Sequence, residues 1–532
     1  MIDLKNSSLD YSTIEPTDVI ECDVVIVGSG AGGGIAAEVL SRSGVKVLLV
    51  EEGPLKTAKD FKMNEKEAYA DLYQEVAGRQ TLDKGIQILQ GRSVGGSTTV
   101  NWTSSFRTPG QTLDYWQNQF SVKGLSKNDL SVWFEWAEQR LKISKWQVPP
   151  NRNNQLLADG ASQLGWSYAA IPRNVSGCAN LGYCGMGCPI NAKQSMLVTC
   201  IPKAIEFGAT LIHRARAESI IHNNGKASGI WLSSMSELGQ IKQRNVTKVV
   251  AKKVILAAGA IGSPAILLRS AVEDPFNNLG RRTFLHPVTA SIAKMNDKVD
   301  AFSGAPQSIY SDQFLWRDGV AGELGYKIEV PPMHPVLSST LLLKHGNEQH
   351  ALMKDFAYYQ ANIALLRDGF NDDSSGGQVS LNQDGHPQLD YKISKTLWRG
   401  LKHALLSMVE LQFAAGAKQV LPLHMDGKMV SNWKDAKGQI LNLVTDKLRW
   451  QTMSAHVMGG CGMGGDPQTS VVDSNGNHHQ IENLTVIDGS LFPTSLGVNP
   501  QLSIYAIAAK LASQLAGEMN ANLPADMPSL KR

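Results

Sequence analysis

One histidine in a glycine-rich loop has the type and surroundings that best suit acid–base chemistry. His456 lies in the segment SAHVMGGCGMGGDP, which runs from Ser454 to Pro467. Histidine is the side chain whose ordinary pKa lies nearest to neutral pH, and the glycines leave its ring room beside a ligand. The segment therefore indicates a general base with a pKa near 7. A core histidine bonded to the backbone is the alternative.

Three cysteines have a spacing that suits a metal centre. Cys178, Cys184 and Cys188 form the pattern C-x5-C-x3-C, and Pro189 follows the last cysteine directly. A three-iron (3Fe-4S) cluster needs only three thiolate ligands, and Cys-Pro endings occur in ferredoxin motifs. Zinc is disfavoured because no fourth Cys or His lies nearby in the sequence. The stretch thus leaves two interpretations: buried packing thiols, which are favoured, and iron–sulfur ligands.

A nucleotide-binding pattern lies near the start of the chain. The apolar run Val24–Val27 is followed by Gly28, Gly30 and Gly33 in the order G-x-G-x-x-G, then by a helical pattern, a second apolar run and Glu51. This order predicts a βαβ unit in which the glycines allow a tight turn, close approach to a pyrophosphate, and packing of helix on strand. Glu51 can accept hydrogen bonds from ribose hydroxyls. The motif alone leaves NAD and FAD open.

Two further glycine-rich segments indicate a longer cofactor site. GRSVGGSTTVNW, Gly91–Trp102, is a backbone-rich loop that can wrap a flat or anionic ligand, with an ordinary glycine turn as the alternative. AAGAIGSPAILLRS places Gly259 at the end of the apolar strand Lys253–Ala258, and Asp488 follows a short strand near the C-terminus. These segments disfavour an NAD enzyme.

Composition limits the class of protein. A chain of 532 residues is long enough for two or more domains. Its formal charge of +3 is small and interspersed, which argues against a nucleic-acid binder. No apolar run reaches the ~18 residues of a membrane span, and the N-terminal segment lacks the pattern of a secretory signal. The six cysteines are then expected to be reduced thiols or cofactor ligands.

The order of strand and helix patterns predicts an α/β fold. Residues 1–20 are polar and predict an irregular arm. Between about residues 297 and 443 the pattern changes to short alternating segments, Gly377–Asn382 and His386–Ile393, followed by the helical Leu397–Phe413. This region predicts a second, α+β domain with a mostly antiparallel sheet.

The sequence resembles the glucose–methanol–choline (GMC) family of FAD-dependent oxidoreductases over nearly its whole length. Four blocks carry the resemblance: VVIVGSGAGGGIAAEVL with VLLVEEG, GRSVGGSTTVN, VILAAGAIGSPAILLRSA, and HVMGGCGMG with NLTVIDGSLFP and NPQLSIYAIA. Within the family, CGMGCPINAKQS and GYKIEVPPMHP (Gly325–Pro335) are similar to the branch of long-chain alcohol oxidases and cholesterol-oxidase-like enzymes.

The resemblance implies a Rossmann-type FAD-binding domain assembled from discontinuous segments and a substrate domain over the flavin. The FAD-binding segments are expected at residues 18–110, 198–290 and 446–525. A lid segment with the cysteine-rich loop is expected at 111–197, and the substrate-binding domain at 291–445.

The resemblance also implies the site residues. His456 aligns with the family's catalytic histidine, and Asn499 aligns with the residue paired with it. His456 is then expected to carry the proton transfer alone, while Asn499 orients the substrate oxygen; a helix N-cap is the alternative for Asn499. The residues expected to bind FAD are Gly28, Gly30, Ala31, Gly33, Glu51, Gly91, Gly95, Gly96, Asn101, Gly259, Asp488, Gly489 and Asn499.

The function implied is oxidation of the CH–OH group of a bulky or apolar alcohol, primary or secondary, by hydride transfer to flavin N5. The electron acceptor is left open among O2, a quinone and a redox protein. The alternative is an FAD and iron–sulfur dehydrogenase of a sugar or polyol, since some members with a similar cysteine stretch carry a cluster. A non-catalytic FAD-fold binding protein is disfavoured because it needs neither His456 nor Asn499. The expected location is cytoplasmic, with peripheral contact to the inner membrane left open.

Overall fold

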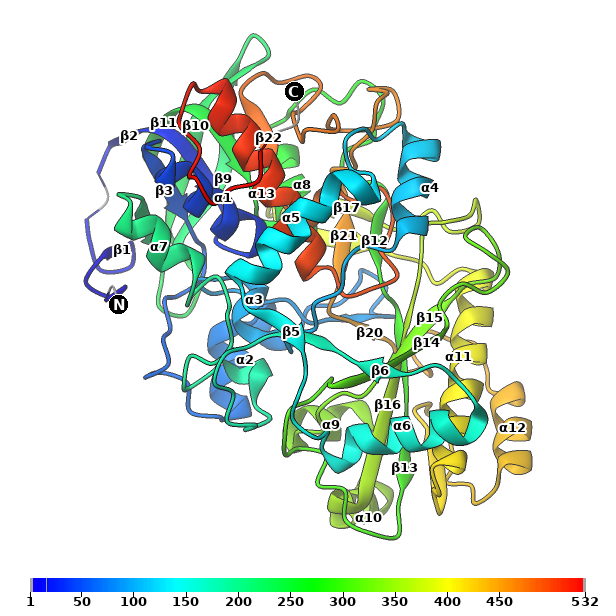
Figure 1. The fold of residues 1–532 in the computed structure, drawn as a ribbon. Helices are drawn as coiled ribbons and strands as arrows, with labels where there is room; N and C mark the ends of the chain where they lie inside the picture. The colour runs from blue at the N-terminus through cyan, green and yellow to red at the C-terminus, as the bar shows by residue number, and fades with distance from the viewer. Residues whose placement is uncertain (1–2, 16, 530–532) are drawn as a thin grey trace.

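The computed structural model describes residues 3–15 and 17–529, and two eight-stranded sheets organise them (Figure 1). In Figure 1 the first sheet lies in the upper left part of the molecule and the second in the lower right. The predicted α/β architecture, a Rossmann-type sheet plus a largely antiparallel one, is confirmed.

The first sheet has the parallel core expected for nucleotide binding. Its order is β1 (Ser8–Asp10), β8 (Thr210–His213), β3 (Val47–Val50), β2 (Val19–Val27), β11 (Ile241–Leu256), β10 (Lys226–Met235) and β9 (Ala215–Asn223), and β22 (Leu484–Val486) also pairs with β11. Pairing is parallel from β1 to β11 and with β22, and antiparallel for β10 and β9. The sheet therefore joins segments far apart in the sequence. Strand β1 lies in the segment predicted to be an irregular arm, and that prediction is wrong because its backbone extends the parallel edge of the sheet.

Helices cover the buried strands of this sheet. The helix α1 (Ala31–Arg42) packs on β2 and β3 and contacts α13 (Gln501–Glu518) and α7 (Cys200–Glu206), while α13 also contacts α5 (Lys127–Arg140). The residues Val24 to Val27 are at most 5% exposed, as expected for a parallel strand with both faces covered.

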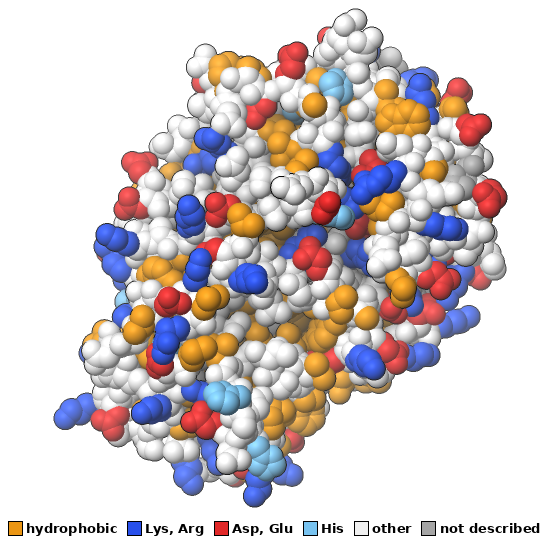
Figure 2. All heavy atoms as spheres, turned by 180° about the vertical axis from the view of Figure 1, so that it is seen from behind, with side chains coloured by type: hydrophobic (Ala, Val, Ile, Leu, Met, Phe, Trp, Pro, Cys, Tyr) orange, Lys and Arg blue, Asp and Glu red, His pale blue; other side chains and the backbone are white. Residues whose placement is uncertain are grey.

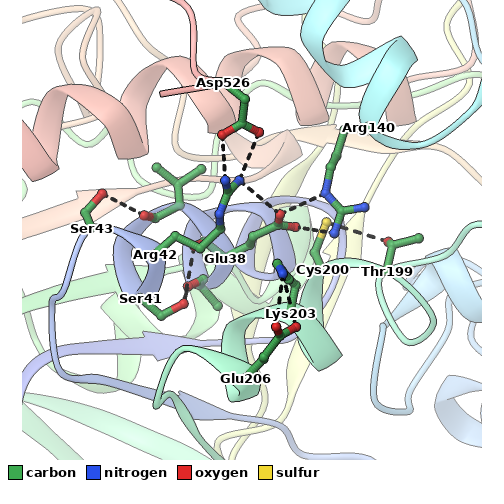
Figure 3. A network of polar contacts seen from close by, with 12 residues as sticks. Glu38, Ser41, Arg42, Ser43, Arg140, Thr199, Cys200, Lys203, Glu206 and Asp526 are labelled. Atoms are coloured by element: carbon green, nitrogen blue, oxygen red, sulfur yellow. Dashed lines mark hydrogen bonds and ion pairs between the residues drawn. The ribbon is translucent and has the colours of Figure 1, made fainter. Parts of the chain in front are cut away.

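A buried carboxylate ties these helices together (Figure 3). Glu38 of α1 accepts two hydrogen bonds of 2.8 Å from Arg140 of α5, and its Oε1 lies 3.5 Å from Nη1 of Arg42. Arg42 in turn binds Asp526 in the C-terminal tail. The network links the first helix to the last described segment of the chain.

The second sheet is mostly antiparallel, as predicted. Its order is β4 (Gln87–Ile88), β20 (Met453–Ser454), β13 (Val288–Lys294), β16 (Tyr359–Leu366), β15 (Tyr326–Glu329), β14 (Ile309–Phe314) and β6 (Ala169–Ala170), and β19 (Gln419–Pro422) also pairs with β13. Only the β4–β20 pair is parallel among these pairings. The helix α11 (Lys395–Ala414) packs on β13 and β16, and α6 (Arg152–Leu164) packs on α11.

The predicted segments of the middle region are confirmed as β17 (Gln378–Leu381), β18 (Pro387–Asp390) and helix α11, although β17 and β18 form a separate two-stranded sheet. The remaining elements are α2 (Glu65–Leu72), η1 (Gln74–Ala77), α3 (Ser97–Val100), α4 (Gly110–Phe120), β5 (Ile143–Lys145), β7 (Pro172–Asn174), η2 (Cys184–Met186), α8 (Gly259–Arg269), β12 (Thr283–Leu285), α9 (Pro335–Leu341), α10 (Gly346–Lys354), η3 (Phe356–Tyr358), α12 (Trp433–Asn442), β21 (Val457–Gly459) and η4 (Gly489–Leu491). None of the helices in the described residues has the length and apolar character needed to cross a membrane.

Candidate active site

One cavity of about 940 Å³ connects the glycine loops of the first sheet to the inner face of the second. Eleven of the thirteen residues expected to bind FAD line it, and so does His456. They are Gly28, Gly30, Ala31, Glu51, Gly91, Gly96, Asn101, Gly259, Asp488, Gly489 and Asn499. The volume of the cavity is near the upper end of the range for sites that bind small molecules. Residues that were proposed from four separate blocks of sequence therefore meet at one place.

The two remaining glycines, Gly33 and Gly95, do not line the cavity because they are needed for packing. A Cβ on Gly33 would lie 1.8 Å from the carbonyl oxygen of Gly28, so only glycine lets helix α1 approach the strand. Gly95 has a φ of +91°, and a Cβ there would lie 2.4 Å from the hydroxyl oxygen of Thr99.

Gly30 has room for a side chain as far as the protein is concerned. It has an ordinary φ of −70°, and the nearest protein atom to an added Cβ would be the Cα of Gly96, at 3.9 Å. An added Cβ would project into the cavity, beside the N-terminus of helix α1. Glycine at this position is therefore explained by the close approach of a ligand, as a pyrophosphate at the helix N-terminus requires. This observation supports the fit of FAD to the cavity.

Glu51 lies at the end of β3, where a ribose is expected. Its Oε2 accepts hydrogen bonds from the backbone N–H (3.1 Å) and the hydroxyl (2.6 Å) of Ser29, and its Oε1 accepts one from the N–H of Gly53 (2.8 Å). Burial raises the pKa of Glu51, and these three hydrogen bonds oppose the rise. Its Oε1 keeps one acceptor position for a ribose hydroxyl.

Asp488 lines the cavity, but the hydrogen bonds of its carboxylate are structural. One carboxylate oxygen accepts hydrogen bonds from the N–H of Gly259 (2.8 Å) and the hydroxyl of Ser263 (2.6 Å), at the start of α8. The other accepts hydrogen bonds from the N–H and hydroxyl of Ser490. Asp488 therefore joins α8 to the C-terminal segment and shapes the wall on which a cofactor would lie.

His456 lines the same cavity and lies next to a second histidine that the sequence did not reveal. Its Nδ1 is 3.0 Å from Nδ1 of His286, and the two rings meet edge to face. Nε2 of His456 is then the ring nitrogen left for a ligand. Burial, helped by the positive charge of Lys327, lowers the pKa of His456 to about 3. The expectation of a base with a pKa near 7 is therefore not met.

Hydrogen bonds determine where these two rings carry their protons. Nε2 of His286 accepts a hydrogen bond of 3.1 Å from the N–H of Gly497. Burial and the neighbouring His456 lower the pKa of His286 well below its usual value, so the neutral ring carries its proton on Nδ1 and donates it to Nδ1 of His456. In this arrangement His456 carries its own proton on Nε2, directed to the cavity side.

Asn499 does not cap helix α13, because that helix begins at Gln501 with Pro500 at the N-cap. Its side chain instead contacts two charged residues of β15. Nζ of Lys327 donates a hydrogen bond to Oδ1, and Nδ2 donates one of 3.4 Å to Oε2 of Glu329. Lys327 and Glu329 lie within the segment GYKIEVPPMHP, but their contact with Asn499 could not be foreseen because 170 residues separate Glu329 from Asn499.

The part of the cavity next to the second sheet is apolar. Alternate residues of two neighbouring strands face it: Val288, Ala290 and Ile292 of β13, and Ala361, Ile363 and Leu365 of β16. Further apolar lining comes from Met333, Leu337, Leu341, Leu342 and Leu423. The intervening β13 residue Ser291 points the other way and bonds Gln412 of α11. The period of two along each strand thus produces an apolar wall.

Apolar residues also reach the surface where the cavity opens. Val76, Leu82 and Leu238 line the cavity, and these side chains are 65%, 52% and 85% exposed. Figure 2 shows that hydrophobic side chains gather among charged ones across the middle and lower part of one face.

The proposed iron–sulfur ligands do not form a metal site. The described residues contain no group of three or more His, Cys, Asp or Glu side chains placed to hold a metal ion. The sulfur of Cys184 instead accepts a hydrogen bond from Arg173 at 3.6 Å. The interpretation of Cys178, Cys184 and Cys188 as cluster ligands therefore receives no support, and they are free cysteines in a loop.

Family models and known relatives match the sequence of this chain. Two models described as GMC oxidoreductase match residues 69–288 and 373–508, and a model described as FAD binding domain matches residues 21–60. An uncharacterized GMC-type oxidoreductase of Mycobacterium tuberculosis is 31% identical over 94% of this chain and 77% of its own length. The long-chain-alcohol oxidase FAO4B of Arabidopsis thaliana is 29% identical over 94% of this chain and 68% of its own length.

Solved structures support the fold. A formate oxidase of Aspergillus oryzae RIB40 superposes with a TM-score of 0.71 at 14% identity, over 95% of this chain and 100% of its own. A pyridoxine 4-oxidase from Mesorbium loti superposes with a TM-score of 0.68 at 17% identity, over 93% of this chain and 99% of its own. From the family models and the relative at 31% identity, the chain belongs to the GMC oxidoreductase family and is an FAD-dependent oxidoreductase.

Proposed function

We propose that this enzyme oxidises the CH–OH group of an apolar alcohol. One observation carries the proposal: a single cavity runs from the glycine cradle past His456 and Asn499 to a wall of aliphatic side chains. Relatives named long-chain-alcohol oxidases agree with it. When bound, FAD supplies the acceptor for the hydride that leaves the alcohol carbon. Oxygen is the proposed electron acceptor, since these relatives are named oxidases.

In this proposal, His456 accepts the hydroxyl proton at Nε2. Acceptance requires the other tautomer, in which Nδ1 of His456 carries the proton and donates it to His286. In this tautomer the shared proton has moved from Nδ1 of His286 to Nδ1 of His456, the Nε2 proton of His456 has passed to water, and Nε2 of His286 has taken up a proton from water, so His286 loses the hydrogen bond from Gly497. The alkoxide that forms beside the ring pairs with the imidazolium and offsets the cost of charging a buried group. Asn499 holds the substrate oxygen.

The activity of the wild-type enzyme should be nearly independent of the ionisation of His456 between pH 5 and 9. A proton acceptor must be neutral, and the pKa of about 3 keeps His456 neutral throughout this range. The rate of flavin reduction by alcohol should fall only as the pH approaches 3. Stopped-flow measurement of flavin reduction by alcohol between pH 4 and 9 gives this rate. An inflection near pH 6.5 that disappears in His456→Ala would contradict the lowered pKa.

Alcohol chain length should set the specificity constant. Each methylene buried against the aliphatic wall contributes about 0.8 kcal/mol, or roughly a three- to fourfold increase in kcat/KM. A series of primary alcohols from two to sixteen carbons should show this rise until the wall is filled, with hydrogen peroxide as the second product. Glucose and sorbitol serve as controls. A sugar or polyol used better than the long alcohols would favour the alternative function.

A further inference from the structure

Two buried charged residues lie directly behind Asn499 and do not line the cavity. Lys327 and Glu329 occupy alternate positions on β15, so their side chains project from the same face of the strand. Their side chains are 1% and 0% exposed, and Nζ lies 2.8 Å from Oε1. A buried ion pair is weak evidence for stability, because desolvation offsets its attraction. Their position next to Asn499 suggests another role.

The ammonium group of Lys327 is held in place from several sides. Nζ lies 3.6 Å from the ring centre of Phe106 and 5.6 Å from that of Tyr310, at distances where aromatic faces attract cations. Burial lowers the pKa of Lys327, and the carboxylate of Glu329 opposes this fall and favours the charged form of the amine. Nζ also donates a hydrogen bond to Oδ1 of Asn499. Phe106, Tyr310 and Glu329 thus hold the charged amine in a fixed position against the amide of Asn499.

This contact decides which way the amide of Asn499 faces. Hydrogen-bond chemistry identifies the oxygen and the nitrogen of this amide. An ammonium group can only donate and a carboxylate can only accept, so Oδ1 faces Lys327 and Nδ2 faces Glu329. The contact to Glu329, at 3.4 Å, uses at most one hydrogen of Nδ2. The other is free to point into the cavity that Asn499 lines.

We propose that Lys327 and Glu329 are positioning residues that lock Asn499 so that it presents an N–H donor, and never its carbonyl oxygen, to the substrate oxygen. The inference rests on the proposed function and deepens it. A fixed donor stabilises negative charge as it develops on the alcohol oxygen, without reorganisation during the reaction. Without the lock, the amide can rotate and offer an oxygen that repels the alkoxide.

The test compares the pair variant Lys327→Met/Glu329→Gln with wild type. Both residues are changed together because a single change leaves an unpaired buried charge. The pair variant should retain FAD, lose about 10- to 100-fold in kcat and change KM by less than about threefold, because the donor matters most in the transition state. Tyr326→Phe is the matched control: Tyr326 neighbours Lys327 on β15, but bonds Ser407 and His403 instead.

The decisive measurement repeats the pair change in an Asn499→Ala background. If the pair acts through Asn499, the pair change should lower kcat by less than about threefold in this background, because the group that it positions is gone. Equal losses in both backgrounds, or loss of FAD from the pair variant, would show that the pair does not act through Asn499 and would overturn the proposal.

A second readout needs neither turnover nor a change at Lys327. A long-chain methyl ketone can only accept a hydrogen bond, and its binding can be followed by the flavin absorbance. Asn499→Leu, which is similar in size and offers no hydrogen-bond donor, should weaken ketone binding about 5- to 10-fold, the contribution of one hydrogen bond. Unchanged ketone binding in Asn499→Leu would overturn the proposal. Ketone binding that depends on Asn499, in an enzyme without alcohol turnover, would refute the proposed function alone.

Discussion

His456→Ala should bind FAD normally and should be reduced by alcohol about 10²–10⁴-fold more slowly than the wild type, the usual contribution of a positioned acid–base group. Flavin binding should survive because the glycine cradle at Gly28 and Gly30 lies at the other end of the cavity. Stopped-flow measurement of flavin reduction under anaerobic conditions gives the rate. Reduction by dithionite, which needs no base, is the control and should be unchanged. Alcohol reduction at the wild-type rate would remove His456 from the chemistry.

His456→Gln separates two ways in which this residue can act. Glutamine can donate a hydrogen bond from a position close to Nε2 but cannot accept a proton at neutral pH. If His456 is the base, as proposed, His456→Gln should be as slow as His456→Ala. A His456→Gln enzyme within about tenfold of wild type would instead show that the Nε2–H tautomer, which the Gly497–His286 bond favours in the structure, is the working form.

Gly30→Val should yield a folded protein that has lost its FAD. An added Cβ at residue 30 has the Cα of Gly96, at 3.9 Å, as its nearest neighbour outside the adjoining residues, so the fold is expected to accept a side chain, which would occupy the space beside the N-terminus of α1. The ratio of flavin to protein absorbance after purification should fall to near zero, while circular dichroism stays that of the wild type.

Gly438→Val is the matched control for this change. Gly438 lies on α12, and an added Cβ there meets no atom within 4 Å. The control should keep full flavin occupancy, so a loss specific to Gly30→Val can be attributed to the cavity. Full flavin occupancy in Gly30→Val would contradict the assignment of the cofactor site.

The sequence predicted the parts of the fold that depend on local pattern. Val24–Val27 with its glycines became β2 and the start of α1, and Leu397–Phe413 became α11. The strand β1 escaped prediction because Ser8–Asp10 is polar and short, and its extended form depends on pairing with β8. The cysteine spacing suggested a cluster, but spacing along the chain does not fix a metal site, and the described residues contain no group of three or more His, Cys, Asp or Glu side chains placed to hold a metal ion.

The same distinction between local sequence pattern and contacts made by folding applies to the candidate site. His456 and the cavity-lining glycines could be found because each lies in a motif. His286 follows an ordinary strand, and its importance arises only from two hydrogen bonds, one to Gly497 and one to His456, more than a hundred residues away. Such residues become visible only when the chain is folded.

The discontinuous first sheet has a consequence for how the protein is made. The strand β22 is the last to be synthesised, and its partner is the end of β11, where Val254 to Leu256 are fully buried. A ribosome that has not yet reached residue 484 leaves this apolar edge unpaired and the wall that Asp488 builds missing. Flavin loading is therefore expected only after the ribosome has passed residue 488, and the yellow colour of the protein becomes a report that synthesis has reached this point.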